Sequence, residues 1–293
     1  MSEPAIWRHA QGTLTIDKPI VVGILNVTPD SFSDGGRFLS VEKALDHAKV
    51  MVDEGADVID IGGESTRPQN ATPVSTEEEL GRVMPIVSTL RKELPQLLLS
   101  IDTTKSEVAE RALADGVANV NDVSGLRLDP RMAAVCAEAR AGVIVMHSRG
   151  GVSDMATYVH ATYDDVAEDV ASELHHWVTA ARAAGVGREA IVVDPGIGFA
   201  KRREHSLEVL HNLGRIVSLG YPVMVGVSRK RFIGDIIGES HPAARVMGTA
   251  GANVAALERG ARLFRVHDVK QNRQALDVAW AVQTAAALAA PSA

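Results

Sequence analysis

Eight short runs of β-branched and apolar residues recur along the chain, and each ends in polar residues that lead into a helical pattern. The runs span Val21–Asn26, Val58–Ile61, Leu97–Asp102, Ala118–Asp122, Val143–His147, Ile191–Asp194, Val223–Ser228 and Leu263–His267. They are almost continuously hydrophobic, which is typical of parallel strands buried on both faces. Because eight strands alternate with helical stretches at about 35 residues per unit, the pattern predicts an α/β protein with a (β/α)8 TIM barrel. A doubly wound open sheet is the alternative.

The segments outside these runs refine the prediction. Ser75-x-x-Glu78 and Thr104-x-x-Glu107 have the spacing of capping boxes, which begin helices. In residues 1–18, Gly12 separates two short alternating runs and predicts a short N-terminal hairpin that closes the barrel bottom. No linker or low-complexity segment divides the chain, so we expect a single domain over residues 1–293.

Composition limits the classes of partner. The 293 residues include 30 Lys and Arg against 37 Asp and Glu, a formal net charge of −7. This acidity argues against nucleic acid or a membrane surface as a partner, so an anion would have to bind in a local pocket. The single cysteine, Cys136, fits a reducing compartment, and neither a signal peptide nor a membrane span is visible. We therefore expect a cytoplasmic protein.

The polar residues at the ends of the runs indicate where a site lies. In a (β/α)8 barrel the carboxyl ends of all strands meet at one face, where active sites are found. That face would present Asn26, Asp60, Asp102, Asn121, Asp122, His147, Asp194, Ser228, Lys230, Arg265 and His267. Burying such groups without partners costs about 1–3 kcal/mol each, so a purely structural barrel would not need one at nearly every strand end. For His147, a structural role in the core is at least as good an interpretation as a ligand.

One flank of this face has the chemistry of an anion site. Closure of the barrel brings the last run beside the first, so Arg265, His267 and Asn26 meet near the start of the final helix. Arginine binds phosphate in a bidentate manner, and a helix N-terminus adds backbone donors. The alternative is that Arg265 pairs with a neighbouring carboxylate such as Asp268.

The opposite flank suits a flat heterocycle that has both donors and acceptors. Asp102 and Asp194 can accept from adjacent ring N–H groups, Asn121 can pair with a ring edge, and Lys230 can donate to a carbonyl or ring nitrogen. Lys230 could instead be a Schiff-base nucleophile, but polar neighbours would keep it charged and disfavour that role. No spacing of His, Cys or Asp indicates zinc.

Two long loops complete the face. Residues 28–37 and 62–68 carry hydroxyl groups and an arginine on a backbone rich in glycine or proline, which is typical of mobile lids. A merely solvated loop is the alternative, but it would leave Phe32 without a role.

The motifs in these segments resemble those of the dihydropteroate synthase family. The resemblance rests on Gly23-Ile-Leu-Asn-Val-Thr-Pro-Asp-Ser-Phe-Ser-Asp-Gly-Gly36 and Asp60-Ile-Gly-Gly-Glu-Ser-Thr-Arg-Pro68. It continues through Ile101–Thr103, Asn121-Asp122, Met146-His147, Asp194–Phe199, Ser228–Gly234 and Arg265–Asp268, and so covers residues 20 to 280.

The resemblance implies a transferase of folate biosynthesis that condenses 6-hydroxymethyl-7,8-dihydropterin pyrophosphate with p-aminobenzoate. It implies Mg2+ assistance, a homodimer and a sulfonamide target. The family's pterin contacts fall on Asp102, Asn121, Met146, Asp194 and Lys230. Its pyrophosphate contacts fall on Asn26, Arg67, Arg265 and His267, with Asn26 near the metal. Its p-aminobenzoate region falls on Phe32, Thr66, Pro68, Phe199 and Ser228.

The resemblance also implies a mechanism in which the C–O bond ionises before the amine attacks. Asp102 would stabilise the developing pterin cation, and Arg67, Arg265 and His267 the departing pyrophosphate. Two other functions are weighed against this one. A pterin-binding methyltransferase would not need Arg67, Arg265 and His267, and a non-catalytic paralog would be expected to lack loop residues such as Thr66 and Arg67.

Overall fold

The computed structural model of the chain describes residues 5–27, 36–65 and 74–288, and eight parallel strands form the predicted barrel within these ranges. The strands are β3 (Ile20–Asn26), β4 (Val58–Gly62), β5 (Leu98–Asp102), β6 (Asn119–Asp122), β7 (Gly142–Met146), β8 (Ile191–Asp194), β9 (Met224–Val225) and β10 (Leu263–Val266). Strand neighbours follow chain order, and β10 pairs with both β3 and β9. A bridge between Val193 and Val223 closes the ring. This order excludes the open-sheet alternative, in which the strand order reverses within the sheet.

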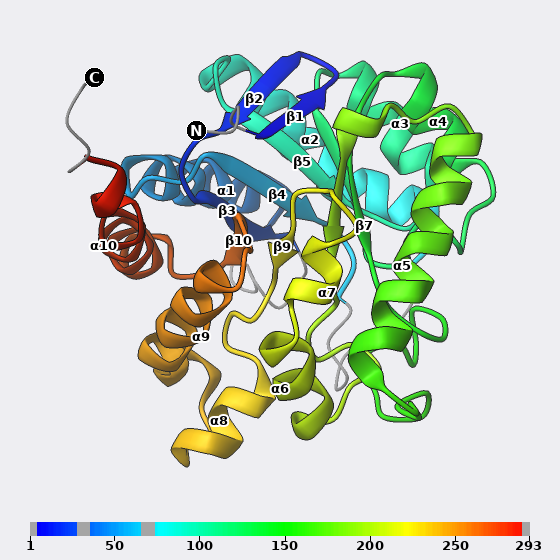
Figure 1. The fold of residues 1–293 in the computed structure, drawn as a ribbon. Coiled ribbons are helices and arrows are strands. Elements are labelled where there is room, and N and C mark those ends of the chain that lie inside the picture. The colour runs from blue at the N-terminus through cyan, green and yellow to red at the C-terminus, as the bar shows by residue number, and fades with distance from the viewer. Residues whose placement is uncertain (1–4, 28–35, 66–73, 289–293) are drawn as a thin grey trace, which may run out of the picture.

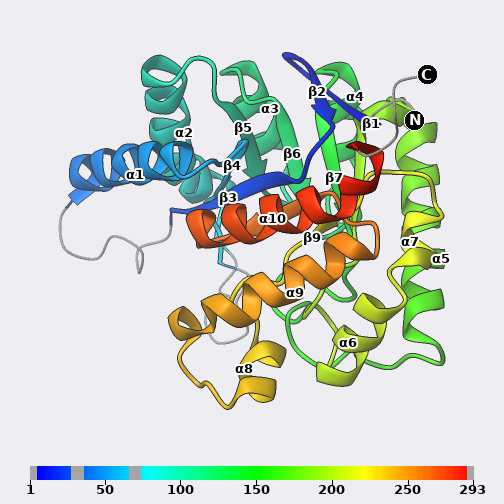
Figure 2. The same ribbon diagram turned by 60° about the vertical axis from the view of Figure 1, so that its left-hand side comes forward.

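Helices surround the strands (Figures 1 and 2). They are α1 (Gly36–Asp53), α2 (Thr76–Glu93), α3 (Ser106–Ala114), α4 (Met132–Glu138), α5 (Val166–Ala183), α6 (Arg203–His211), α7 (Gly214–Val217), α8 (Arg231–Ile237), α9 (Val246–Glu258) and α10 (Val269–Leu288). Short 3-10 turns span Arg188–Ala190 and Pro242–Arg245. None of the helices in the described ranges is long and apolar enough to cross a membrane.

The two predicted capping boxes have different outcomes. Ser75 precedes α2, and its side chain accepts a hydrogen bond from the backbone N–H of Glu78 at 3.1 Å, as predicted. The box at Thr104 is wrong. The backbone N–H of Ser106, at the start of α3, instead donates to Asp129 Oδ2 at 2.8 Å, because the loop after β6 brings this carboxylate to the end of the helix.

The N-terminal hairpin covers one end of the barrel, as predicted. Strands β1 (Ala5–His9) and β2 (Gly12–Ile16) pair in an antiparallel manner. Trp7 is fully buried, and its Nε1 donates to the backbone carbonyl of Ala190 at 2.9 Å, just before β8. It packs in the cluster that fills this end of the barrel, formed with Ile16, Ile20, Val22, Val58, Ile144, Val192, Met224 and Leu263. Apolar side chains therefore close this end, and polar chemistry is confined to the other.

Strand register places the polar side chains in levels inside the barrel. Asp60, Ser100 and Asn119 are neighbours across β4, β5 and β6. Two residues further along, Asp102 and Asn121 are neighbours at the carboxyl ends of their strands. Because side chains alternate along a strand, residues two apart face the same side, and both levels project into the barrel. The carboxyl end of the barrel is therefore lined with polar groups.

Strand β9 is much shorter than the predicted run Val223–Ser228. The backbone leaves the sheet after Val225 and turns, with the N–H of Lys230 bonded to the carbonyl of Val227 at 3.1 Å. Arg229 takes a left-handed conformation with φ 58° in this turn. The turn places Ser228 and Lys230 on the rim of the barrel instead of inside the sheet.

Candidate active site

Arg265 lies at the centre of the rim between two carboxylates. Its Nε donates to Asp60 Oδ2 at 2.6 Å, and its Nη2 donates to Asp102 Oδ2 at 2.7 Å. The amide of Asn121 donates to the same Asp60 oxygen at 2.9 Å. Asp60 is fully buried, whereas the side chains of Arg265 and Asp102 remain 20% and 17% exposed. This ion-pair network therefore has a closed, buried side at Asp60 and an open side at Asp102.

The alternative that Arg265 pairs with a carboxylate is confirmed, but its partners are Asp60 and Asp102 and not Asp268. Arg265 does not pair with Asp268, because Asp268 holds Arg229 through two hydrogen bonds of 2.9 and 2.6 Å. Asp60 was recognised only as a residue at a strand end, yet it orients both Arg265 and Asn121. Its position in the buried run Val58–Ile61 is the signal that could have singled it out, since a charge there needs a partner.

Asp194 and Lys230 form the next part of the rim. Asp194 Oδ1 accepts from the backbone N–H of Gly196 at 2.7 Å, which orients the carboxylate at the end of β8. Lys230 Nζ lies 4.0 Å from the centre of the Phe199 ring, and the Lys230 side chain also packs beside Gly198. Met146 is the strand neighbour of Asp194 and is buried in one cluster with Phe199. Apolar surface and charged groups thus lie together on this flank.

Burial shifts the ionisation of these groups. It raises the pKa of Asp102 to about 7, with Arg265 opposing the rise and Asp60 adding to it. It raises the pKa of Asp194 to about 6 against the opposing effects of its hydrogen bond and Lys230. It lowers the pKa of Lys230 to about 8, although Asp194 favours the charged form. Burial thus outweighs the polar neighbours in the direction of the shift, but with a pKa of about 8 Lys230 stays mostly charged at pH 7, as expected.

Ser228, His267 and Asn26 lie around Arg265 on the rim. Ser228 follows β9, between the strands of Arg265 and Asp194, whereas Asn26 ends β3 on the other side of β10. Ser228 Oγ is 2.9 Å from His267 Nδ1, and it accepts from the backbone N–H of His267 at 3.1 Å. Asn26 ends β3 opposite Gly62 and is half-buried. The structure therefore brings Asn26 and His267 to the same rim as Arg265, but the guanidinium itself points toward Asp60 and Asp102.

His147 has a structural environment. It is fully buried, its ring stacks on Trp177 at 5.2 Å, and its Nε2 lies 3.2 Å from Glu173 Oε2. Its other nitrogen, Nδ1, lies 2.8 Å from Nζ of Lys201. Lys201 is not among the residues predicted for the site, although this lysine closely follows the motif that begins at Asp194.

Four of the predicted site residues, Phe32, Thr66, Arg67 and Pro68, lie outside the described residues. The chain on either side of residues 66–73 is held by a buried ionic cluster. Glu64 Oε1 accepts from the backbone N–H of Val74 at 2.8 Å and lies 3.1 Å from Lys105 Nζ. Lys105 also donates to the buried carboxylate of Glu79 at 2.6 Å.

The donors near Asn26 fit a loosely held Mg2+ ion. Within the described ranges, no three His, Cys, Asp or Glu side chains gather as a metal site. Mg2+ in phosphate-transfer sites, however, often binds one or two protein oxygens and takes its other ligands from phosphate and water. A side chain at Gly62 would lie 3.7 Å from Asn26 Oδ1 and 3.6 Å from Asp102 Oδ2, so the glycine keeps the space between these two oxygens open.

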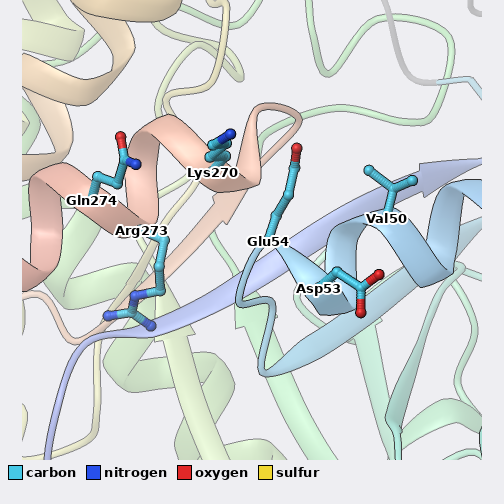
Figure 3. Close-up of a pocket in the computed structure, with 6 residues that line it drawn as sticks. All are labelled: Val50, Asp53, Glu54, Lys270, Arg273 and Gln274. Atoms are coloured by element: carbon cyan, nitrogen blue, oxygen red, sulfur yellow. The ribbon is translucent and has the colours of Figure 1, made fainter.

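A separate cavity of about 410 Å³ lies in the outer helical layer (Figure 3). It is lined by the end of α1 and the first turns of α10, through Val50, Asp53, Glu54, Lys270, Arg273 and Gln274. The side chains point in different directions (Figure 3), and Arg273 is held by Asp57 at 3.2 Å. No strand-end residue lines this cavity, so it is not part of the rim.

The chain matches the family described as "Pterin binding enzyme" over residues 22–267. It is 45% identical over 255 residues to the dihydropteroate synthase of Bacillus subtilis, which covers 87% of this chain and 85% of that protein.

Two solved structures have the same fold. The dihydropteroate synthase of Xanthomonas albilineans with 4-aminobenzoic acid superimposes with a TM-score of 0.89 at 43% identity, covering 98% of this chain and all of that one. The same enzyme in complex with 7,8-dihydropteroate gives a TM-score of 0.83 at 42% identity, covering 95% and 97% of the two chains. The similarity therefore extends over nearly the whole length of both proteins.

Proposed function

The chain belongs to the dihydropteroate synthase family of pterin binding enzymes, and on that premise we propose how its rim residues share the work of the reaction. The enzyme is a transferase of folate biosynthesis. It condenses 6-hydroxymethyl-7,8-dihydropterin pyrophosphate with p-aminobenzoate to give 7,8-dihydropteroate and pyrophosphate. The observation that supports the assignment of roles is the convergence of Asp60, Asp102, Asn121 and Arg265 in one hydrogen-bonded network at the strand ends.

The pterin binds against Asp102, Asn121, Met146, Asp194 and Lys230. The two carboxylates accept from the ring N–H groups, Lys230 donates to a ring acceptor, and Met146 supplies apolar surface beside Asp194. Because both carboxyl pKa values are raised by burial, a ligand that offers N–H donors and positive charge favours their ionised forms.

The pyrophosphate binds beside Asn26, Arg265 and His267, with Arg67 from the second loop. Asn26 would hold Mg2+ together with pyrophosphate oxygens, and the ion would supply charge neutralisation to the leaving group. Arg265 is paired with Asp60 and Asp102, so its guanidinium is oriented before the substrate arrives.

The p-aminobenzoate region comprises Phe199 and Ser228, with Phe32, Thr66 and Pro68 from the loops. Phe199 and Lys230 are in contact, so the site of the second substrate adjoins that of the pterin. A sulfonamide that mimics p-aminobenzoate would compete for this region.

The reaction begins with cleavage of the C–O bond of the pterin methylene, and the electron pair leaves with the pyrophosphate. Asp102 stabilises the positive charge that develops on the pterin, while Arg67, Arg265 and His267 stabilise the negative charge on the leaving group. The neutral aromatic amine then attacks the methylene, forms the C–N bond and loses its proton to solvent. No general base is required for the attack of a neutral amine.

The direct test is to incubate the protein with the pterin pyrophosphate, p-aminobenzoate and Mg2+ and to measure pyrophosphate release. Release that depends on the amine and yields 7,8-dihydropteroate is the expected result. Release that proceeds equally without the amine would indicate a hydrolase and contradict the proposal.

The partner in solution is a second copy of the chain, which would form a homodimer. A large apolar surface lies on α8 and α9, where Ile236, Ile237 and Met247 are 55%, 49% and 78% exposed. Beside it, a hollow of about 480 Å³ lies between α6, α8 and α9. Such patches on soluble domains commonly mark interfaces. Light scattering should give the mass of a dimer for the wild type and a mass closer to the monomer for Met247→Glu. A monomeric mass for the wild type would refute the dimer.

The enzyme acts in the cytoplasm. Its single cysteine, Cys136, is buried and free, as is common in a reducing compartment. Fractionation of cells that express the protein tests this location.

A further inference from the structure

Lys201 is a buried lysine that the proposed reaction does not use. It follows the loop of residues 195–200 that connects β8 to α6, and its side chain is only 1% exposed. Its Nζ lies 2.8 Å from His147 Nδ1, 3.1 Å from the carbonyl of Phe199 and 3.2 Å from the carbonyl of Gly196.

The number of these contacts matches the chemistry of an ammonium group. A protonated lysine has three N–H donors, and the three contacts of Nζ are three acceptors. A buried charge is tolerated when its hydrogen bonds are made, and a neutral amine would leave one acceptor without a donor. Lys201 therefore supplies a donor to both loop carbonyls and to His147 Nδ1 only when it is charged.

The loop that Lys201 holds has a backbone conformation that needs support. Gly196 and Gly198 have φ angles of 63° and 80°, and Ala200 has a φ of 45°, which is unfavourable for a residue with a side chain. A Cβ at Gly196 would lie 1.8 Å from the carbonyl oxygen of His147, so the backbone packs directly against the end of β7. Such a conformation persists only where the surroundings hold it.

The same loop presents two groups to the proposed active site. The backbone N–H of Gly196 donates to Asp194 Oδ1 at 2.7 Å, and the ring of Phe199 lies against Lys230. Lys201 bonds the carbonyls of both Gly196 and Phe199. A shift of Lys201 would therefore move the partner of the Asp194 carboxylate and the ring beside Lys230 together.

Behind Lys201, a chain of charged and polar groups fixes its position. Burial, together with the charge of Lys201, lowers the pKa of His147 to about 3, so the ring is neutral. Since Nδ1 accepts from Lys201, Nε2 carries the proton and donates to Glu173 Oε2. Arg149 also binds Glu173, and its Nε donates to Glu173 Oε1 at 3.0 Å.

We propose that Lys201 is a positioning residue which, held by His147 and Glu173, fixes the loop of residues 195–200 so that it presents Asp194 to the pterin and Phe199 to p-aminobenzoate. Lys201 touches neither substrate. The proposal rests on the roles given to Asp194 and Phe199 above.

The test compares Lys201→Met, which keeps the length of the side chain but removes all three donors, with the exposed Lys270→Met as control. In Lys201→Met the KM values for both substrates should rise at least tenfold, with a smaller fall in kcat. Amide hydrogen exchange should become at least tenfold faster in residues 196–200 and stay unchanged in Ile191–Asp194. Lys270→Met should match the wild type in all of these measurements.

A purely structural role would lower the melting temperature of Lys201→Met but leave its KM values and loop exchange at wild-type levels, and that result would overturn the proposal. If Lys201→Met does not fold, Lys201→Gln retains a donor and should raise both KM values at least threefold; wild-type values there would also overturn it. Asp194→Asn separates the proposal from the function. If Asp194→Asn weakens pterin binding and the folded Lys201 variants do not, the positioning role fails while the function stands. If no variant weakens pterin binding, the role of Asp194 fails, and the proposal fails with it.

Discussion

Replacing Asp102 by asparagine should lower activity and raise stability at the same time. Asp102 lies in the rim, bonded to Arg265 at 2.7 Å, and burial raises its pKa from 3.8 to about 7. A shift of this size corresponds to a penalty of the order of 4 kcal/mol for the ionised form in the folded protein. Asparagine removes that penalty but also weakens the bond to Arg265, so the expected gain in the free energy of unfolding at pH 8 is about 1–3 kcal/mol.

The sign of this effect depends on pH. Because the pKa of Asp102 is raised on folding, the wild-type protein binds a proton in the folded state between pH 3.8 and about 7, and its stability falls as the pH rises through this window. Urea denaturation at pH 8 should therefore show Asp102→Asn to be more stable than the wild type, and this advantage should shrink as the pH is lowered from 8 to 5. A variant less stable than the wild type at pH 8 would refute the dominant role of burial.

The activity of the same variant tests the electrostatic role. A charge about 6 Å from a developing unit charge, at an effective dielectric constant of about 20, contributes about 3 kcal/mol, or roughly a hundredfold in kcat. In the wild type, kcat/KM should fall as the pH falls below about 7, because Asp102 becomes protonated, and this acid limb should be shallower in Asp102→Asn. Near-normal kcat in Asp102→Asn with intact pterin binding would refute the role in stabilising the cation.

Three other predictions concern the rim and the opposite end of the barrel. Arg265→Met leaves Asp60 buried without its ion pair, so the free energy of unfolding measured by urea titration should fall by about 3–5 kcal/mol. An unchanged free energy of unfolding would mean that the pair is not needed for stability. Trp7→Ala should also lower the free energy of unfolding by about 3–5 kcal/mol, but it should leave the KM values unchanged. A change in KM would contradict the conclusion that the hairpin end of the barrel is separate from the site. For the wild type, kcat/KM should fall as the pH rises above about 8, since burial lowers the pKa of Lys230 to that value, and persistence of this limb in Lys230→Met would exclude Lys230 as its source.

The barrel and the location of the site could be predicted because both depend on order along the chain. Eight buried runs, each followed by a helix, leave few ways to pack, and parallel strands with helical connections place every carboxyl end on the same face. Asp102, Asn121, Asp194 and Arg265 could be grouped for that reason alone. The strand ends were less predictable, as the short β9 illustrates, because the turn at Arg229 depends on contacts made elsewhere.

The sequence by itself thus determined which residues reach the rim, because their positions follow from the period of the strands and their order in the chain. Only the tertiary structure decided how these residues pair. Arg265 is bound to Asp60, 205 positions away, and Lys201 to His147, 54 positions away. Such pairings, and the pKa shifts of Asp102 and Lys230, depend on distances through space and on the removal of water, and neither quantity is encoded at any single position of the chain.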